Sequence, residues 1–282
     1  MRFGAHVSIA EHLYSAVDRA RENSCEAFQI FPGNPRGWKT GPFPDREVAE
    51  FKERRLAAGL GPVAIHLPYL VNLAAKTPRV AEASVLSLKD ALAKAIILDA
   101  EFLVMHPGSH GGDGTAAGIE RLTVGLSEVL KEDFGRTKLL LENTAGAGHT
   151  LGSTMAEIGN IIDAAGGDER LGLCFDTCHA FVAGYDLAAE KGLDRTLREI
   201  DEDIGLDRLK VVHANDCKGE LGSHLDRHQH IGRGRIGLGG FERLVNHPAL
   251  ADQAVIIETP KKAPDDDLKN LAKLRSLRRE QF

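Results

Sequence analysis

Short runs of apolar residues recur along the whole chain, and most of them end in a polar residue. Clear examples are residues 62–66 (PVAIH), 101–106 (EFLVMH), 138–143 (KLLLEN) and 171–176 (LGLCFD). Runs of the same kind occupy residues 2–7, 26–31, 209–216 and 254–259. A nearly continuous apolar run of this length is typical of a parallel strand buried on both faces. The pattern therefore predicts eight strands.

The segments between these runs have a helical pattern instead. Apolar residues recur at three- and four-residue spacing in residues 80–100 and 155–167, for example. Short apolar runs could also be buried helices, but glycine, proline and charged residues on both sides of most runs favour strands. Eight strands alternating with helices predict an α/β fold, a single (β/α)8 TIM barrel with its active site at the C-terminal ends of the strands. Without a linker-like stretch, residues 1–282 are expected to form one domain.

Composition and charge add only broad limits. Hydrophobic residues make up 43% of the 282 residues and charged residues 27%, which is typical of a globular protein. No apolar run approaches the roughly 20 residues of a membrane span, and the N-terminus lacks an apolar signal core. Four cysteines without a CxxC pair favour a reducing, cytoplasmic setting. The net charge of −6 argues against an anionic partner, although three divalent cations would bring −6 + 6 to zero.

The polar residues that end the apolar runs are chemically related. In chain order, the residues read at the eight strand ends are His6, Phe31, His66, His106, Glu142, Asp176, His213 and Glu258. The third to the eighth are all histidine, glutamate or aspartate, and the strand ends of such a barrel converge on one mouth. Because imidazoles and carboxylates crowded together resist desolvation unless cations hold them, this pattern predicts a metal site.

Two further segments extend the candidate set. In residues 173–186 (LCFDTCHAFVAGYD), Asp176 ends a strand and His179 follows three residues later, where it can reach a neighbouring ion. In residues 224–232 (HLDRHQHIG), Asp226 and His228 alternate so that both could face one ion, and spacing alone leaves His230 equally possible. Cys174 and Cys178 are expected to pack as small apolar residues rather than to bind metal.

These residues form a set of five histidines and four carboxylates: His66, His106, Glu142, Asp176, His179, His213, Asp226, His228 and Glu258. Nine ligands are too many for one tetrahedral zinc, but they suffice for two or three ions if a carboxylate bridges. Clustered metal ions are a recurring solution for phosphoryl chemistry, because they activate water and stabilise the entering and leaving oxygens.

The chain resembles the endonuclease IV family of abasic-site DNA repair nucleases along almost its whole length. The motifs that carry the resemblance are GAHVS (4–8), FPGNPRGW (31–38), HLPYLVNLA (66–74), HPGSH (106–110), ENTAG (142–146), FDTCHAFVAGYD (175–186), HANDCKGELGSHLDRHQHIG (213–232), GRGRIG (232–237) and IIET (256–259). One departure is Ala10, Glu11 and His12, where many relatives have a glycine pair in a loop that contacts DNA.

The resemblance implies a TIM barrel with three zinc ions, for which manganese could substitute. It implies that His66 and His106 bind the first ion and that Glu142 bridges to a second. The second ion is completed by Asp176, His213 and Glu258, and the third is bound by His179, Asp226 and His228. The family pattern thus favours His228 over His230, and it leaves His6 and His110 without a role.

The implied reaction is hydrolysis of the phosphodiester 5′ to an abasic site, which leaves a 3′-hydroxyl and a 5′-deoxyribose phosphate. Trimming of blocked 3′ ends is a second implied activity. A hydroxide bridging two zinc ions would be the nucleophile, since zinc lowers the pKa of its water towards about 7. Glu142 could orient this hydroxide, and it is the predicted catalytic residue.

The implied partner is duplex DNA with abasic sites or blocked 3′ ends. The protein is expected to bind this DNA as a monomer and to have no membrane partner. Asn34, Arg36 and Trp38 follow the second strand, and Tyr69 follows the third. A guanidinium can fill space between bases, and an aromatic ring offers a face to a base. The family residues that match Arg36 and Tyr69 insert into DNA at the lesion, and Asn34 is a further predicted contact. For Trp38, DNA contact and ordinary partial burial are both open.

Two other classes of protein are alternatives. A sugar isomerase or epimerase of the xylose isomerase-like superfold also gathers such ligands, but it needs one or two ions, and the set His179, Asp226 and His228 would have no purpose. A DNA-binding module with structural zinc would have closed and mostly cysteine-rich sites. The predicted ligands are instead oxygen- and imidazole-rich and lie in an open mouth.

Overall fold

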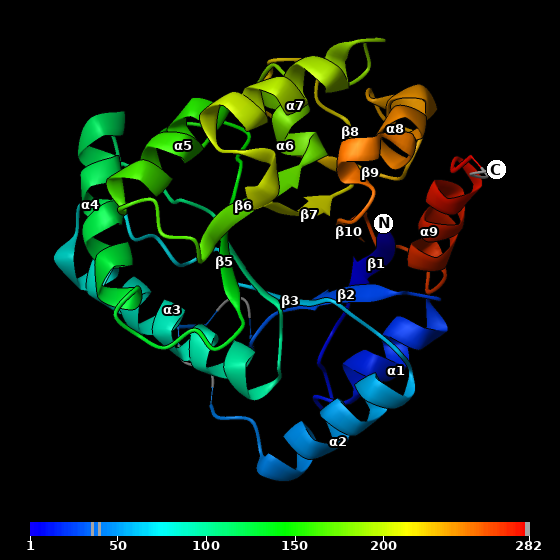
Figure 1. The fold of residues 1–282 in the computed structure, drawn as a ribbon, viewed down its shortest axis with the longest axis horizontal. Coiled ribbons are helices and arrows are strands. Elements are labelled where there is room, and N and C mark those ends of the chain that lie inside the picture. Colours follow the sequence, from blue (N-terminus) through cyan, green and yellow to red (C-terminus); the bar gives the residue numbers. More distant parts are fainter. Residues whose placement is uncertain (35–36, 39–40, 280–282) are drawn as a thin grey trace.

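The computed structural model describes residues 1–34, 37, 38 and 41–279 and has a closed barrel of eight parallel strands (Figure 1). The strands are β1 (Arg2–His6), β2 (Ala27–Ile30), β3 (Val63–His66), β4 (Phe102–Met105), β5 (Lys138–Glu142), β6 (Leu171–Asp176), β7 (Leu209–His213) and β10 (Ala254–Ile257). Each strand pairs with the one before it, and β10 closes the barrel on β1, where Phe3 lies opposite Val255. The TIM barrel prediction is confirmed.

Helices surround the barrel. They are α1 (Ser15–Glu22), α2 (Asp45–Ala57), α3 (Pro78–Ile97), α4 (Thr115–Val129), α5 (Met155–Ala164), α6 (Thr177–Ala183), α7 (Gly192–Asp203), α8 (Gly237–Asn246) and α9 (Asp266–Ser276), with 3-10 turns at Leu206–Arg208 and Pro248–Leu250. The C-terminal helix α9 packs beside β1, so the last helix lies against the first strand where the barrel closes (Figure 1). None of the helices within the described residues has the length and apolar character needed to cross a membrane.

The apolar face of each helix packs on the outside of the sheet. Phe28, Phe51, Leu88, Leu92 and Phe175 are among the fully buried side chains of this outer core. A second, smaller apolar cluster fills the inside of the barrel, as expected where alternate residues of a strand point inward. Gly4 shows how tightly the barrel closes, because a Cβ atom there would lie 1.8 Å from the carbonyl oxygen of Ala27 on the neighbouring strand.

A short hairpin outside the barrel carries part of the candidate site. It consists of β8 (Asp216–Cys217) and β9 (His228–Gln229), which pair antiparallel. The buried carboxylate of Asp216 accepts hydrogen bonds from the backbone N–H groups of Gly234 at 2.8 Å and Ile236 at 3.1 Å. These bonds tie the glycine-rich segment 232–237 to the hairpin, and a Cβ atom at Gly234 would clash with Asp216.

Candidate metal centre

A ring of polar side chains lies at the C-terminal end of the barrel, one from each strand or the residue after it. Its members are His6, Gln29, His66, His106, Glu142, Asp176, His213 and Glu258. On every barrel strand except β1, the position two residues earlier belongs to the inner apolar cluster, so the alternation of the strands brings both sets to the inside. Seven of the eight residues were identified from the strand ends. Gln29 was missed, because the apolar run continues to Phe31 while β2 ends at Ile30.

Glu142 lies at the centre of this ring, and its two carboxylate oxygens face different partners. Oε2 lies 2.8 Å from Nε2 of His66 and 3.1 Å from Nε2 of His106. Oε1 lies 3.0 Å from Nδ1 of His213 and 3.3 Å from Nδ1 of His179. Glu142 is fully buried. A carboxylate divided in this way has the geometry to join two neighbouring ion sites.

The predicted ligands fall into three groups, within each of which the candidate ligand atoms lie within 4.8 Å of one another. The first consists of His66, His106 and Glu142, and the second of Glu142, Asp176, His213 and Glu258; the third is made of His179, Asp226 and His228. All nine sequence-predicted ligands are therefore brought together, and Glu142 belongs to two groups. These groups could hold metal ions.

The third group joins the barrel to the hairpin. Nε2 of His179, at the start of α6, lies 3.2 Å from Oδ2 of Asp226, and Nε2 of His228 lies 3.4 Å from Oδ1 of the same residue. Nε2 of His228 is buried and has no hydrogen-bond partner among the described residues. A buried nitrogen without a partner is costly unless something binds it, so this atom fits a metal ligand. His230 instead turns away, with Nδ1 3.0 Å from Nδ2 of Asn270 on α9.

Backbone carbonyl groups fix the orientation of three histidine rings. In each of them Nδ1–H donates to a backbone carbonyl. His66 donates to Leu67 at 2.7 Å, His179 to Asn143 at 2.9 Å, and His228 to Glu258 at 3.0 Å. A carbonyl oxygen can only accept, so Nδ1 carries the proton and Nε2 is left for the site. The donor set, consisting of imidazole nitrogens and carboxylate oxygens, suits zinc, manganese or iron.

The electrostatics of the ring agree with this arrangement. Burial alone would raise the pKa of the Glu142 carboxyl, but the imidazoles of His213, His106 and His179 hold that pKa well below its ordinary value. Burial likewise acts to lower the pKa of His179, yet the carboxylates of Asp176, Asp226 and Glu142 raise it well above the usual range for histidine. The imidazoles around the buried carboxylate of Glu142 therefore stabilise its ionised form.

Cys174 and Cys178, which were expected only to pack, lie close to the predicted ligands. All four are buried and free of disulfides. Sγ of Cys174 lies within 4.8 Å of ligand atoms of Glu142 and His213, and Sγ of Cys178 is similarly close to Asp176 and His228. Burial raises the pKa of the Cys174 thiol to about 12. The packing role remains the prediction for both residues.

Further polar residues hold the carboxylates from behind. Nδ2 of Asn215 donates to Oδ2 of Asp176 at 2.6 Å, and Oδ1 of Asn215 accepts from the backbone N–H of Glu258 at 2.8 Å. Asn143 exchanges two hydrogen bonds with the backbone of Asp176, at 2.7 and 3.0 Å. Both asparagines follow strand-end ligands in the motifs ENTAG and HAND. This adjacency was the available signal for their role.

Of the residues predicted to contact DNA, Tyr69 lies beside the ring of polar side chains. The Tyr69 side chain is 69% exposed, and its ring centroid lies 5.7 Å from that of His106. Asn34 is exposed, and its carbonyl accepts from the backbone N–H of Gly37 at 3.1 Å. Trp38 is 40% exposed. Arg36 lies outside the described residues.

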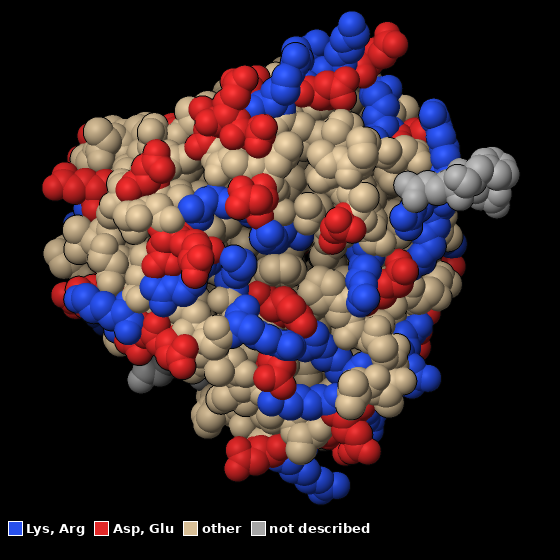
Figure 2. Space-filling model, in the orientation of Figure 1, with Lys and Arg blue, Asp and Glu red and all other residues tan. Residues whose placement is uncertain are grey.

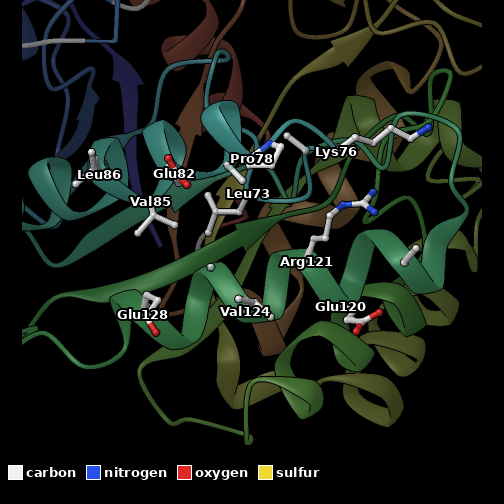
Figure 3. A pocket seen from close by; sticks show the side chains of 14 residues that line it. Leu73, Lys76, Pro78, Glu82, Val85, Leu86, Glu120, Arg121, Val124 and Glu128 are labelled. Atoms are coloured by element: carbon white, nitrogen blue, oxygen red, sulfur yellow. The ribbon is translucent and has the colours of Figure 1, made fainter.

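Two cavities differ in their relation to this site. A cavity of about 220 Å³ adjoins the ring and is lined by Tyr69, Asn72, His106, Ser109, His179 and Asp226, among others. A larger groove of about 770 Å³ lies between α3 and α4, with Val85 on the α3 side and Val124 on the α4 side (Figure 3). Its lining contains none of the nine predicted ligands. The smaller cavity is therefore the one that gives access to the metal centre.

Charge on the surface is mixed. Figure 2 shows basic and acidic side chains interspersed over the face seen there. Around the hairpin, however, the exposed side chains of Lys218, Arg227, Arg233 and Arg235 outnumber the carboxylates of Glu220 and Asp226. Arg235 pairs with Glu220. A local excess of positive charge therefore lies beside the third ligand group, although the chain carries a net charge of −6.

Comparison with known proteins agrees with the barrel and its polar mouth. Residues 17–279 match the family described as Xylose isomerase-like TIM barrel. A D-tagatose 3-epimerase-like protein has a TM-score of 0.74 at 24% identity, covering 98% of this chain and 97% of that one, which is a likeness of fold alone. The fold and the site together define an enzyme of the xylose isomerase-like class with candidate metal-binding groups in its mouth.

Proteins of higher sequence identity show which family within this class the chain belongs to. The protein named Probable endonuclease 4 from Methanoculleus marisnigri is 46% identical over 276 residues, which cover 97% of this chain and 98% of that protein. Endonuclease IV from Thermus thermophilus has a TM-score of 0.88 at 40% identity, over 98% of both chains. The chain belongs to the endonuclease IV family. It is accordingly a hydrolase of the nuclease class.

Proposed function

We propose that this protein is an abasic-site endonuclease of base excision repair. It hydrolyses the phosphodiester 5′ to an abasic site in duplex DNA, leaving a 3′-hydroxyl and a 5′-deoxyribose phosphate, and it removes blocked 3′ ends. We further propose that it acts as a cytoplasmic monomer and that residues 1–282 function as one domain. The names of its relatives, endonuclease 4 and endonuclease IV, support a nucleic-acid substrate.

The observation that carries this proposal is the division of the Glu142 carboxylate between two groups of ligands. It supports three zinc ions, with manganese as a substitute. His66 and His106 would hold the first ion together with Glu142; Glu142, Asp176, His213 and Glu258 would hold the second; and His179, Asp226 and His228 would hold the third. When bound, such ions lower the pKa of water, supplying a hydroxide nucleophile at neutral pH, and neutralise charge on the phosphate.

The residues of the chain itself position these groups and the substrate. Glu142 is the proposed catalytic residue, because its buried carboxylate can orient the attacking water between the first two ligand groups. The open side of the third group, beside Asp226, faces the cavity through which a phosphodiester can approach. The basic side chains around the hairpin lie where they can meet the phosphates on either side.

Recognition of the lesion is assigned to the rim. Tyr69 stands beside His106 with most of its ring exposed, so it can stack on a base while the backbone of the lesion lies on the metal centre. Arg36 and Asn34, from the segment after β2, would contact the DNA beside it. Extruding the abasic nucleotide costs least at a damaged position, which is itself a source of selectivity.

The test is incubation with duplex DNA that carries one tetrahydrofuran abasic analogue. The expected product is a strand cut 5′ to the analogue, with undamaged duplex left intact and activity lost after chelation. Elemental analysis of protein purified without chelator should approach three metal ions per chain. Epimerisation of a sugar without incision would favour the alternative class, and a value near one ion with full activity would overturn the trinuclear assignment.

A further inference from the structure

Gln29 belongs to the polar ring, but an amide is not a typical metal ligand. Its side chain connects three other members of the ring. It lies on β2 and is fully buried. Its Nε2 lies 2.7 Å from Oε1 of Glu258 and 3.0 Å from Nδ1 of His6, and its Oε1 lies 2.9 Å from Nε2 of His213. Every hydrogen-bonding group of the amide thus faces a side chain of the ring.

The directions of these hydrogen bonds follow from the chemistry of the partners. The Glu258 carboxylate can only accept, so the amide must present its nitrogen there, and the opposite orientation would place two oxygens in contact. The amide oxygen then accepts Nε2–H from His213. The proton of the His213 ring is therefore on Nε2, and Nδ1 is left to face the carboxylates of Glu142 at 3.0 Å and Glu258 at 3.4 Å.

His213 is held differently from the other histidines described above. His66, His179 and His228 donate Nδ1–H to backbone carbonyl groups and present Nε2 to the site. His213 presents Nδ1 instead, and a side chain on another strand, 184 positions away in the sequence, fixes its ring. The same amide occupies Oε1 of Glu258, so Oε2 is the oxygen that faces the second ligand group.

We propose that Gln29 is a positioning residue for the second ion site, the group formed by Glu142, Asp176, His213 and Glu258. It sets the tautomer and ring direction of His213, and it turns one oxygen of Glu258 towards the ion. This role rests on the proposed function, since it requires that the group binds a metal. Gln29 makes no contact with the reacting atoms, so its effect reaches catalysis only through these two ligands.

The test measures metal affinity rather than activity. Metal-free protein would be titrated with Zn²⁺ and with Co²⁺ against a competing chelator, for the wild type, Gln29→Met and Gln29→Glu. Methionine keeps a similar length but loses all three hydrogen bonds. Loss of a partner of this kind costs about 10- to 100-fold in metal affinity. That loss is expected for one of the three equivalents in Gln29→Met, while the other two bind as in the wild type.

Gln29→Glu separates the two contacts and serves if Gln29→Met does not fold. Its carboxylate still accepts from His213 but faces Glu258 with a second negative oxygen, so the same equivalent should again weaken. Asn270→Leu is the matched control, because Asn270 is a buried amide that bonds to Thr259 and His230 rather than to the nine predicted ligands. It should bind all three ions as the wild type does, even where its melting temperature falls.

Unchanged affinity for all three equivalents in both Gln29 variants would overturn the inference. So would an equal weakening of all three in a folded variant, because that pattern indicates a general structural effect. These results leave the proposed function standing as long as the wild type binds three ions and cuts abasic DNA. A wild type that does neither would remove the proposed function and this inference together.

Discussion

The inside of the barrel has two layers, formed by inward-facing residues that are two positions apart on the same strands. One layer is apolar and the other is polar. The lower layer is the inner apolar cluster: Ala27, Ala64, Val104, Leu140, Cys174, Val211, Ala254 and Ile256. The upper layer is the polar ring. Leu140 and Glu142 are consecutive inward residues of β5, and both are fully buried. Burial of the Leu140 side chain stabilises the fold. Burial of a charged group such as the Glu142 carboxylate costs several kcal/mol unless neighbouring groups compensate for the lost hydration.

The two layers contribute differently to stability and to function. The lower layer needs only shape and volume, so it contributes to the free energy of unfolding. The upper layer has three buried or half-buried carboxylates that converge on His213, and it is stable only as a hydrogen-bonded and charge-balanced set. Substitutions in the lower layer should therefore change stability and leave metal binding intact, whereas those in the upper layer should change metal binding and chemistry.

The largest effect is expected for Glu142→Gln. The amide keeps the size of the side chain but lacks the charge that joins the first two ligand groups. Single-turnover incision of abasic duplex should fall by several orders of magnitude, while a binding assay still detects the complex. Glu128→Gln, at an exposed carboxylate of α4, is the control and should cut at the wild-type rate. An unimpaired Glu142→Gln enzyme would remove this residue from the mechanism.

Leu140→Ala should have a large effect on stability rather than on the reaction. Removing a fully buried leucine from the lower layer leaves a cavity, which costs about 2–5 kcal/mol of the free energy of unfolding. Denaturant unfolding would measure this loss, and elemental analysis should still find the metal content of the wild type. Selective loss of metal from a folded Leu140→Ala protein would show that the two layers are not separable.

A smaller effect is expected at the rim above both layers. Tyr69→Ala removes an exposed ring that can stack on a base, which is worth about 1–3 kcal/mol of binding free energy. Changing Arg36 to alanine as well should weaken binding further, without altering metal content. Leu86→Ala is the matched control, since Leu86 is 68% exposed but lies on α3 in the outer groove. Equal affinity of the double variant and the wild type for abasic duplex would refute the assignment of these residues.

The smallest effect is expected for Cys174, which belongs to the lower layer although its sulfur lies near the ligands. Cys174→Ala and Cys178→Ala should each cost about 1 kcal/mol of stability and leave the metal content unchanged. Cys25→Ala, at a buried cysteine away from the site, provides the comparison. Loss of one metal equivalent in either of the first two variants would instead place a thiol among the ligands.

The upper layer was largely visible in the sequence, because a strand imposes a fixed alternation and the apolar runs ended in ligand-type residues. His106 and Glu258 illustrate this, since each follows the last residue of its strand. Gln29 was missed for a physical reason. An amide is not a typical metal ligand, and its role comes from contacts with His213 and Glu258 on other strands, which no local pattern encodes.

The hairpin could not be placed by periodicity either. Asp226 and His228 alternate with His230, and only the folded chain shows that His230 turns to Asn270 while His228 turns to the site. The role of His228 as a ligand, which the family resemblance implied, stays a prediction.

The hairpin also determines how the third ligand group of such an enzyme can change. Asp226 and His228 reach the mouth from a segment that takes no part in the closed sheet, and the buried carboxylate of Asp216 ties residues 234–236 to this segment. Insertions or deletions between β8 and β9 would alter the third ligand group without disturbing a single barrel strand. The proposed third ion site thus depends on one loop together with His179, so a change in that loop would remove this site and leave the other two groups of ligands at the ends of the barrel strands.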